Sequence, residues 1–146
     1  IYSFLISLVV YPVSGHWIWG GGFLAKIGVM DFAGGIVIHV SAGFAALASV
    51  IFLGRRDDMK PGEPTVPNNL PLVAVGAGLL WFGWFGFNGG SEFAADGIAA
   101  LAILNTVVAS GAALLSWMVV EKIAVGKPTL VGAVTGLVAG LVVITR

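Results

Sequence analysis

One stretch without charged residues constrains this chain more than any other feature. From Phe32 to Gly54 the sequence contains no aspartate, glutamate, lysine or arginine. At about 1.5 Å of rise per residue, a helix of this length crosses a bilayer core of about 30 Å. Asp31 stands where an N-cap could accept hydrogen bonds from the first free amides, and Gly54 provides a stop signal. We therefore predict a transmembrane helix over about residues 32–54.

The composition agrees with a membrane protein. Apolar residues make up 58% of the chain, charged residues 10%, and glycine occurs 22 times, as is typical of packed membrane helices. The absence of cysteine excludes disulfides and thiolate metal sites, and the formal net charge of +0 argues against a nucleic-acid partner. No cofactor is indicated. Because the chain begins at Ile1 and ends at Arg146 in apolar runs, we expect an internal fragment of a longer protein.

The remaining apolar runs predict an all-α fold, a polytopic transmembrane helix bundle. We expect the end of one helix at 1–12, stopped by Pro12 and Gly15, and then an irregular interfacial loop over 13–30. Residues 55–69, rich in charge and proline, predict an exposed connector. Further spans are expected at about 70–90, 97–121 and 128–146, all within one transmembrane domain covering 1–146.

Polar and small residues in the later spans make further predictions. Asn105 falls inside a span, where a buried amide needs a partner. Three glycines repeat every four residues and so share one face of a helix, which would let another helix approach closely: Gly132, Gly136 and Gly140. The positive-inside rule predicts a cytoplasmic side carrying Arg55, Arg56, Lys60, Lys122 and Lys127, with Lys26 and Arg146 on the other side.

His39 is the first candidate for function. Counted from Asp31 it lies about 12 Å along the predicted helix, close to the membrane midplane, where ionisable residues are costly and favour a functional role. A histidine that only bridges two helices by hydrogen bonds remains an alternative. Its helical neighbours are mostly small, which predicts a close-packed stripe that includes Gly35, Ala42, Gly43 and Ala46. A metal site is disfavoured because one histidine supplies too few ligands, and His16 is expected to be exposed.

A second candidate lies at the predicted outer end of the 70–90 span. Trp84, Phe87 and Ser91 are three and four residues apart, so they line one face that points to the same mouth as Trp19. Such a stripe is most often packing, but ring faces and a hydroxyl can also hold a small cation, with a stabilisation of about 0.5–2 kcal/mol. A bare alkali ion would meet an uncompensated desolvation cost in the apolar lumen. A weak-acid cation such as ammonium avoids that cost by releasing a proton, with a neutral imidazole to meet it.

Several motifs together resemble the ammonium transporter family (Amt/Mep, with the Rh proteins as relatives). They cover nearly the whole chain: HWIWGGG at 16–22, DFAGG with His39 and GRR at 31–56, NLP at 69–71, GWFGFNGGS at 83–91, ADGIAALAILNT at 95–106 and GKP at 126–128. The resemblance implies part of an eleven-helix fold, usually a homotrimer in the cell membrane, with a prokaryotic plasma membrane favoured. It also implies ammonium or ammonia as substrate and a cytoplasmic regulatory protein as a further partner.

The resemblance also implies roles for individual residues. Trp19 and Ser91 match an external ammonium recruitment site, Phe87 an aromatic gate, and His39 and Trp84 the pore lining, with proton relay at the histidine. Asp31 matches a residue that supports the site structurally. A second pore histidine and a second gate phenylalanine would belong to helices outside this chain.

Other functions remain open beside ammonium transport. The nearest alternative is an ammonium sensor or an Rh-like gas channel on the same fold, although Trp19 favours the Amt/Mep branch. A non-transporting membrane scaffold, in which His39 and the aromatic residues only pack, is an alternative of another class. An enzyme is the weakest candidate, because no nucleophile with a base and no paired carboxylates share a face.

Overall fold

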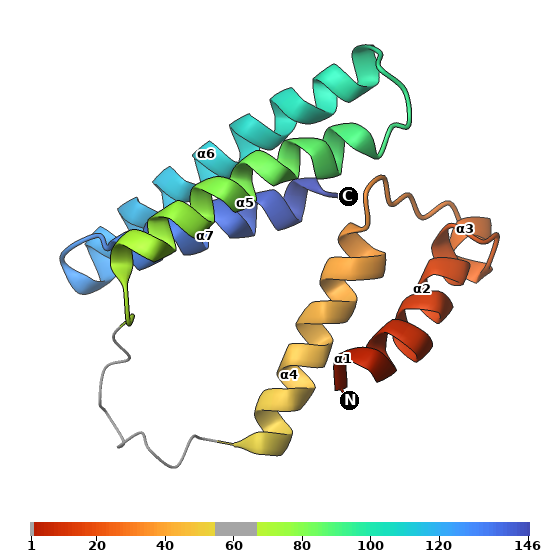
Figure 1. The fold of residues 1–146 in the computed structure, drawn as a ribbon, viewed down its shortest axis with the longest axis horizontal. Helices are drawn as coiled ribbons and strands as arrows, with labels where there is room; N and C mark the ends of the chain where they lie inside the picture. The colour runs from red at the N-terminus through yellow and green to blue at the C-terminus, as the bar shows by residue number, and fades with distance from the viewer. Residues whose placement is uncertain (1, 55–66) are drawn as a thin grey trace. The chain divides into compact units, whose positions relative to one another are not determined.

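The computed structural model describes residues 2–54 and 67–146, and within these ranges all regular secondary structure is helical, as the sequence predicts (Figure 1). The chain divides into an N-terminal unit, Ile1–Asn68, and a C-terminal unit, Asn69–Arg146. The N-terminal unit contains α1 (Tyr2–Leu5), η1 (Ile6–Val10), α2 (Tyr11–Ile18), α3 (Phe23–Lys26), η2 (Gly35–Val40) and α4 (Ser41–Leu53), of which η1 and η2 are π-helical. The C-terminal unit contains α5 (Leu70–Gly90), α6 (Gly97–Val125) and α7 (Leu130–Ile144).

The first helix does not stop at Pro12 and Gly15, and that prediction is wrong. Proline lacks an amide and clashes with the carbonyl four residues earlier in a regular α-helix. Here it follows η1, where the wider π turn has Tyr11 N–H bonded to the Ile6 carbonyl, and it occupies the first turn of α2. The helical path therefore continues to Ile18, and the short helix α3 lies in the segment expected to be an irregular loop.

The helix that carries His39 begins at Gly35 rather than at residue 32. Gly34 precedes it with φ of 114°, a left-handed conformation that L side chains rarely adopt. The helix then runs through η2 and α4 to Leu53 and ends at Gly54, the predicted stop, with φ of 70°. The basic residues that the orientation prediction counts next, Arg55, Arg56 and Lys60, lie outside the described residues.

In the C-terminal unit each helix begins with a side-chain cap. Asn69 accepts from Leu72 N–H, with Pro71 tolerated in the first turn as predicted, and Asp96 accepts from Ile98 and Ala99 N–H. α5 has the predicted bounds, whereas α6 continues past the expected end at residue 121. Glutamate and lysine are good helix formers, so the helix ends only at Gly126, where φ is 88°.

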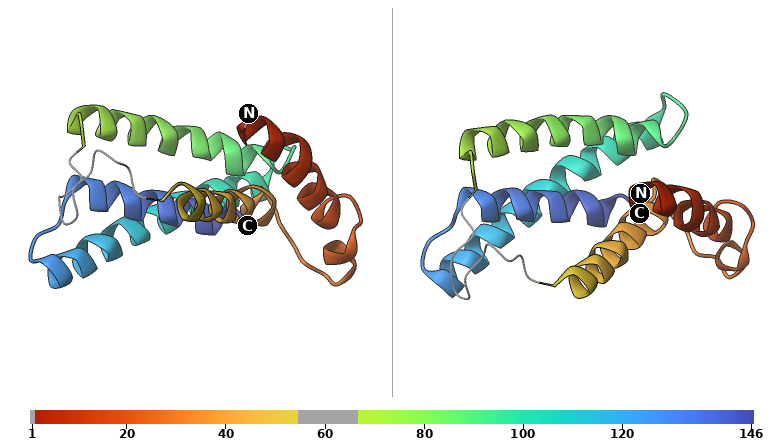
Figure 2. Two further views of the ribbon diagram at one scale, coloured as in Figure 1. Left: turned by 90° about the horizontal axis from the view of Figure 1, so that it is seen from below. Right: turned by 60° about the horizontal axis from the view of Figure 1, so that its bottom comes forward.

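The predicted glycine face of α7 is confirmed. Gly132, Gly136 and Gly140 are buried, and α7 lies against α6 in every view (Figure 2). A Cβ atom added at Gly140 would lie 2.6 Å from the Ala109 carbonyl oxygen, and one at Gly136 would lie 2.8 Å from that of Ala113. The two backbones therefore approach more closely than any side chain at these positions would allow.

The buried amide of this unit is not the one the sequence indicated. Asn105 is exposed, whereas Asn88 is 2% exposed and donates from Nδ2 to Thr106 Oγ1 over 2.9 Å. Asn105 and Thr106 are consecutive in α6, and consecutive side chains of an α-helix point about 100° apart. Thr106, and not Asn105, faces α5.

Among the described residues, three helices are long and apolar enough to cross a membrane: Gly35–Leu53, Leu70–Gly90 and Gly97–Val125. Large apolar side chains are widely exposed on them, such as Phe52 at 89% and Phe82 at 75%. Apolar exposure on this scale is foreign to a water-soluble domain and suits contact with lipid or with further membrane helices.

Candidate functional site

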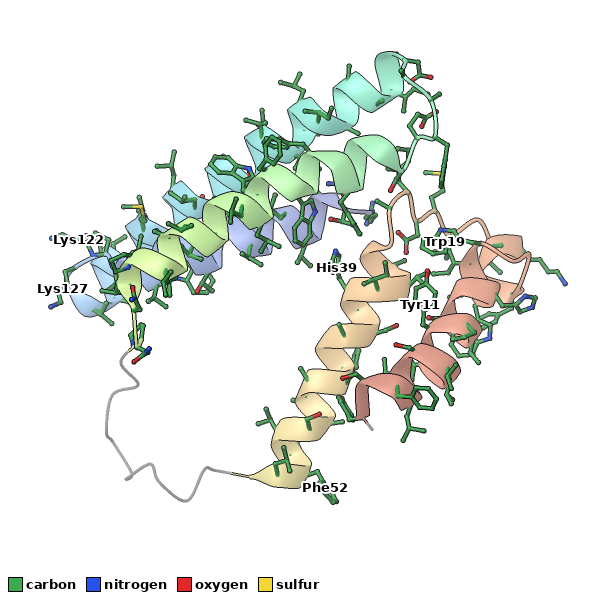
Figure 3. All side chains as sticks on the ribbon, in the orientation of Figure 1. Tyr11, Trp19, His39, Phe52, Lys122 and Lys127 are labelled. Atoms are coloured by element: carbon green, nitrogen blue, oxygen red, sulfur yellow. The ribbon has the colours of Figure 1, made fainter. Side chains whose placement is uncertain are left out.

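The residues singled out by the sequence fall equally into the two units. Trp19, Asp31 and His39 belong to the N-terminal unit, and Trp84, Phe87 and Ser91 belong to the C-terminal unit. Figure 3 labels Trp19 at the end of α2 and His39 in the first turns of the helix that ends near Phe52. Each group is described within its own unit.

Asp31 organises the start of the His39 helix. Its carboxylate accepts from the backbone N–H groups of Gly34, Ile36 and Val37 at 2.7, 2.8 and 2.9 Å. These amides have no carbonyl partner within the helix, and the positive end of the helix dipole also favours a carboxylate there. The expected acceptance from the first free amides is confirmed, although Asp31 lies four residues before the helix begins and is 7% exposed.

Trp19 forms a hydrogen bond with Asp31 as well. Its indole Nε1–H donates to the backbone carbonyl of Asp31 over 2.7 Å. Asp31 therefore holds the indole through its backbone and the helix start through its side chain. Because the N–H is used in this bond and the side chain is 47% exposed, the indole has ring surface left for a ligand.

His39 lies in the π-helical segment η2 and is partly exposed. It is the fifth residue of the helix that starts at Gly35, so it lies only about 6 Å along the axis. This distance along the axis is shorter than the one that the sequence predicts when counted from Asp31. A position of His39 at the membrane midplane stays a prediction. Short π-helical segments are frequent at functional sites.

The close-packed stripe expected around His39 is wrong for the described residues. Gly35 is buried, but Ala42, Gly43 and Ala46 are exposed, and a Cβ atom added at Gly43 would meet nothing within 4 Å. Within this unit, η2 packs on α2 through another face, where Ser14 Oγ lies 3.4 Å from the Val37 carbonyl oxygen. The small residues after His39 therefore form an open stripe on α4.

In the C-terminal unit, Trp84 and Phe87 lie together as their spacing predicts. Their ring centroids are 5.6 Å apart with planes inclined at 53°. Trp84 Nε1–H donates to Thr145 Oγ1 at the end of α7 over 2.9 Å. The sequence analysis missed Thr145, because no local pattern links residues 61 positions apart.

Ser91 directly follows the last residue of α5. Its hydroxyl donates to the Phe87 carbonyl over 2.7 Å, so its proton is used locally, whereas its oxygen still has lone pairs that can accept from a donor. Asn88 points into the contact with Thr106 instead of joining this face. For the part of the chain that the structure describes, no cluster of three or more His, Cys, Asp or Glu could hold a metal.

The chain matches the family model described as "Ammonium Transporter Family" over residues 1–146. It is 55% identical over 145 residues to an ammonium transporter of Aquifex aeolicus, which covers 99% of this chain and 33% of that protein. The chain thus spans about a third of the length of this relative.

Two solved structures are similar in fold. The crystal structure of Candida albicans Mep2 matches with a TM-score of 0.90 and 40% identity, covering 99% of this chain and 33% of that one. A structure titled "Sensor Amt Protein" matches with a TM-score of 0.85 and 36% identity, covering 96% of this chain and 37% of that one.

Proposed function

Because this chain belongs to the ammonium transporter family and its described residues include three helices able to cross a membrane, we propose that it is part of a multi-pass membrane protein that transports ammonium or ammonia. The observation that carries this proposal is the family match, which extends over residues 1–146. The relatives of this chain are transporters rather than enzymes.

Recruitment of the cation is assigned to Trp19 and Ser91. The exposed indole of Trp19 offers a ring face, and its orientation is fixed by the bond to Asp31. Cation–π attraction to such a ring stabilises a small cation by about 0.5–2 kcal/mol, depending on its desolvation. The Ser91 oxygen adds an acceptor for an ammonium N–H. Asp31 supports this site by holding both Trp19 and the start of the His39 helix.

The next step is passage of an aromatic gate. Phe87 is 37% exposed and its ring lies beside that of Trp84, so we assign the gate to the Phe87 ring. An apolar gate selects for a species that sheds its hydration at low cost, which favours neutral ammonia over a charged ion.

His39 receives the substrate beyond the gate. A neutral imidazole both donates and accepts hydrogen bonds, so it can bind ammonia or pass on the proton that ammonium releases. The π-helical segment that carries His39, and the carboxylate cap at its start, fix the backbone from which the ring projects. Trp84 is assigned to the pore lining beside this path.

Assembly and regulation follow the same family proposal. We assign the exposed Lys122 and Lys127, which flank the turn between α6 and α7, to the cytoplasmic side (Figure 3). A homotrimer with one pore in each subunit and a cytoplasmic regulatory protein complete the proposal.

An ammonium sensor on the same fold is the second candidate. Its support is the similarity to the structure titled "Sensor Amt Protein". Flux separates the two functions, because a sensor binds ammonium without moving it at a transporter's rate.

The decisive experiment measures ammonium flux into vesicles that contain the whole protein carrying this chain. Replacement of His39 by alanine is expected to lower flux at least about tenfold, because positioned proton-transfer groups commonly contribute more than that. The matched control is His16→Ala, which removes the other, exposed histidine and is expected to leave flux unchanged. Unchanged flux in His39→Ala, at equal insertion and assembly, would contradict the proton-relay role.

A further inference from the structure

We infer that Thr145 is a positioning residue that sets the orientation of the Trp84 indole for transport. The inference deepens the proposed function and rests on it. Thr145 is the residue directly after α7, 61 positions from Trp84, and the sequence pattern of this helix singled out only its glycines.

The hydrogen bonds of Thr145 have a fixed direction. Its hydroxyl donates to the Leu141 carbonyl over 2.7 Å, so the lone pairs of Oγ1 are left to accept from another donor. That donor is Trp84 Nε1–H at 2.9 Å, and an indole nitrogen can only donate. The side chain of Thr145 is fully buried, at 0% exposure, so water does not compete for the bond.

This bond determines the tilt of the indole. An N–H bond at one edge of the indole restricts rotation of the ring about its Cβ–Cγ axis, and the tilt of 53° against Phe87 depends on that rotation. The adjacent Asn88–Thr106 bond links the next turn of α5 to α6 and so opposes rotation of the helix itself. Thr145 therefore restrains the rotation of the Trp84 indole beside Phe87.

Thr135 offers a matched control on the same helix. Its hydroxyl also donates to the carbonyl four residues earlier, over 2.7 Å, but its side chain is exposed. Thr135→Val and Thr145→Val therefore remove the same local bond, and only the second removes the acceptor of Trp84. Thr145→Ser keeps that acceptor.

The test measures ammonium flux and the ratio of ammonium to methylammonium flux in vesicles, at equal amounts of inserted protein. Thr145→Val is expected to lower ammonium flux and to shift the ratio by roughly three- to tenfold, since a buried donor loses its acceptor. Thr145→Ser and Thr135→Val are expected to match the unsubstituted protein. If Thr145→Val does not insert, Thr145→Ala removes the same acceptor without the added methyl group.

A second background separates positioning from packing. In Trp84→Phe, which has no indole N–H, removal of the Thr145 hydroxyl is expected to have no further effect on the flux ratio. An equal shift in that background, or no shift with Trp84 present, overturns the inference while the proposed transport stands. Absence of flux in the unsubstituted protein overturns the transport function, and this inference with it.

Discussion

The two units hold their candidate residues in different ways. In the N-terminal unit, side chains bond to backbone groups: Asp31 to three nearby amides, Trp19 to the Asp31 carbonyl and Tyr2 to the Ala45 carbonyl. Its helical paths contain π turns and a left-handed glycine. In the C-terminal unit, three uninterrupted α-helices are joined by a glycine face and by bonds between side chains, Trp84 to Thr145 and Asn88 to Thr106.

The difference shows two ways of placing a polar group in an apolar helix. The N-terminal unit departs from regular α-helical geometry and satisfies the freed backbone amides by nearby side chains. This local change sets the direction of a single residue such as His39. The C-terminal unit keeps regular helices and fixes their rotation by close packing, which aims a whole face. We therefore expect the local cap at Asp31 to contribute most to stability in the N-terminal unit. In the C-terminal unit, we expect the close approach of helix backbones to contribute most.

The largest expected effect comes from placing a side chain in the close contact between α6 and α7. Gly140→Val would place Cβ 2.6 Å from a backbone oxygen that cannot move aside, so we expect a loss of about 3 kcal/mol in the free energy of unfolding in detergent. Gly76→Ala on α5, where nothing lies within 4 Å, is the control and should stabilise the protein slightly. Equal stability of the two variants would show that the glycine face does not hold this unit.

A smaller effect is expected from the cap of the His39 helix. Asp31→Ala removes the acceptor of three buried or partly buried amides and should cost about 2 kcal/mol. Hydrogen exchange of the amides of Gly34, Ile36 and Val37 would report it directly. The comparison is Asp96→Ala, an exposed cap of two amides in the other unit, expected to cost about 1 kcal/mol. A greater loss of stability in Asp96→Ala than in Asp31→Ala would contradict the expectation that the local cap matters more in the N-terminal unit.

The smallest effect tests which amide is buried. Thr106→Val leaves the Asn88 side chain without its acceptor, and we expect a loss of about 1.5 kcal/mol in the free energy of unfolding. Asn105→Leu, at the exposed neighbouring position, should change the stability by less than about 0.5 kcal/mol. If Asn105→Leu proves the more damaging, the buried pair has been assigned to the wrong residue.

Much of the fold could be predicted from local sequence. The bounds of α5, the stop at Gly54 and the glycine face of α7 follow from composition, capping residues and spacing, all of which act over a few positions. Pro12 misled because its effect depends on the π turn before it, and a π turn has no clear sequence signal. Asn105 misled because hydropathy marks a span but does not say which side of it is buried.

The candidate site was partly predictable for the same reason. Spacing on one helix brought Trp84 and Phe87 together, and a carboxylate before a helix indicated the cap at Asp31. Thr145 and the double role of Asp31 toward Trp19 could not be foreseen, since each joins segments that approach only in the folded chain.

The sequence by itself determined that this chain forms apolar membrane-length helices of the ammonium transporter family, because hydrophobicity and motif residues are properties of the chain read in order. Only the tertiary structure decided the direction of each indole, the burial of Asn88 in place of Asn105 and the late start of the His39 helix. The indole directions and the burial of Asn88 depend on which donor bonds to which acceptor in the folded chain, and those partners lie 12 to 61 residues apart. The start of the His39 helix depends on the backbone conformation that Gly34 and the Asp31 carboxylate adopt together.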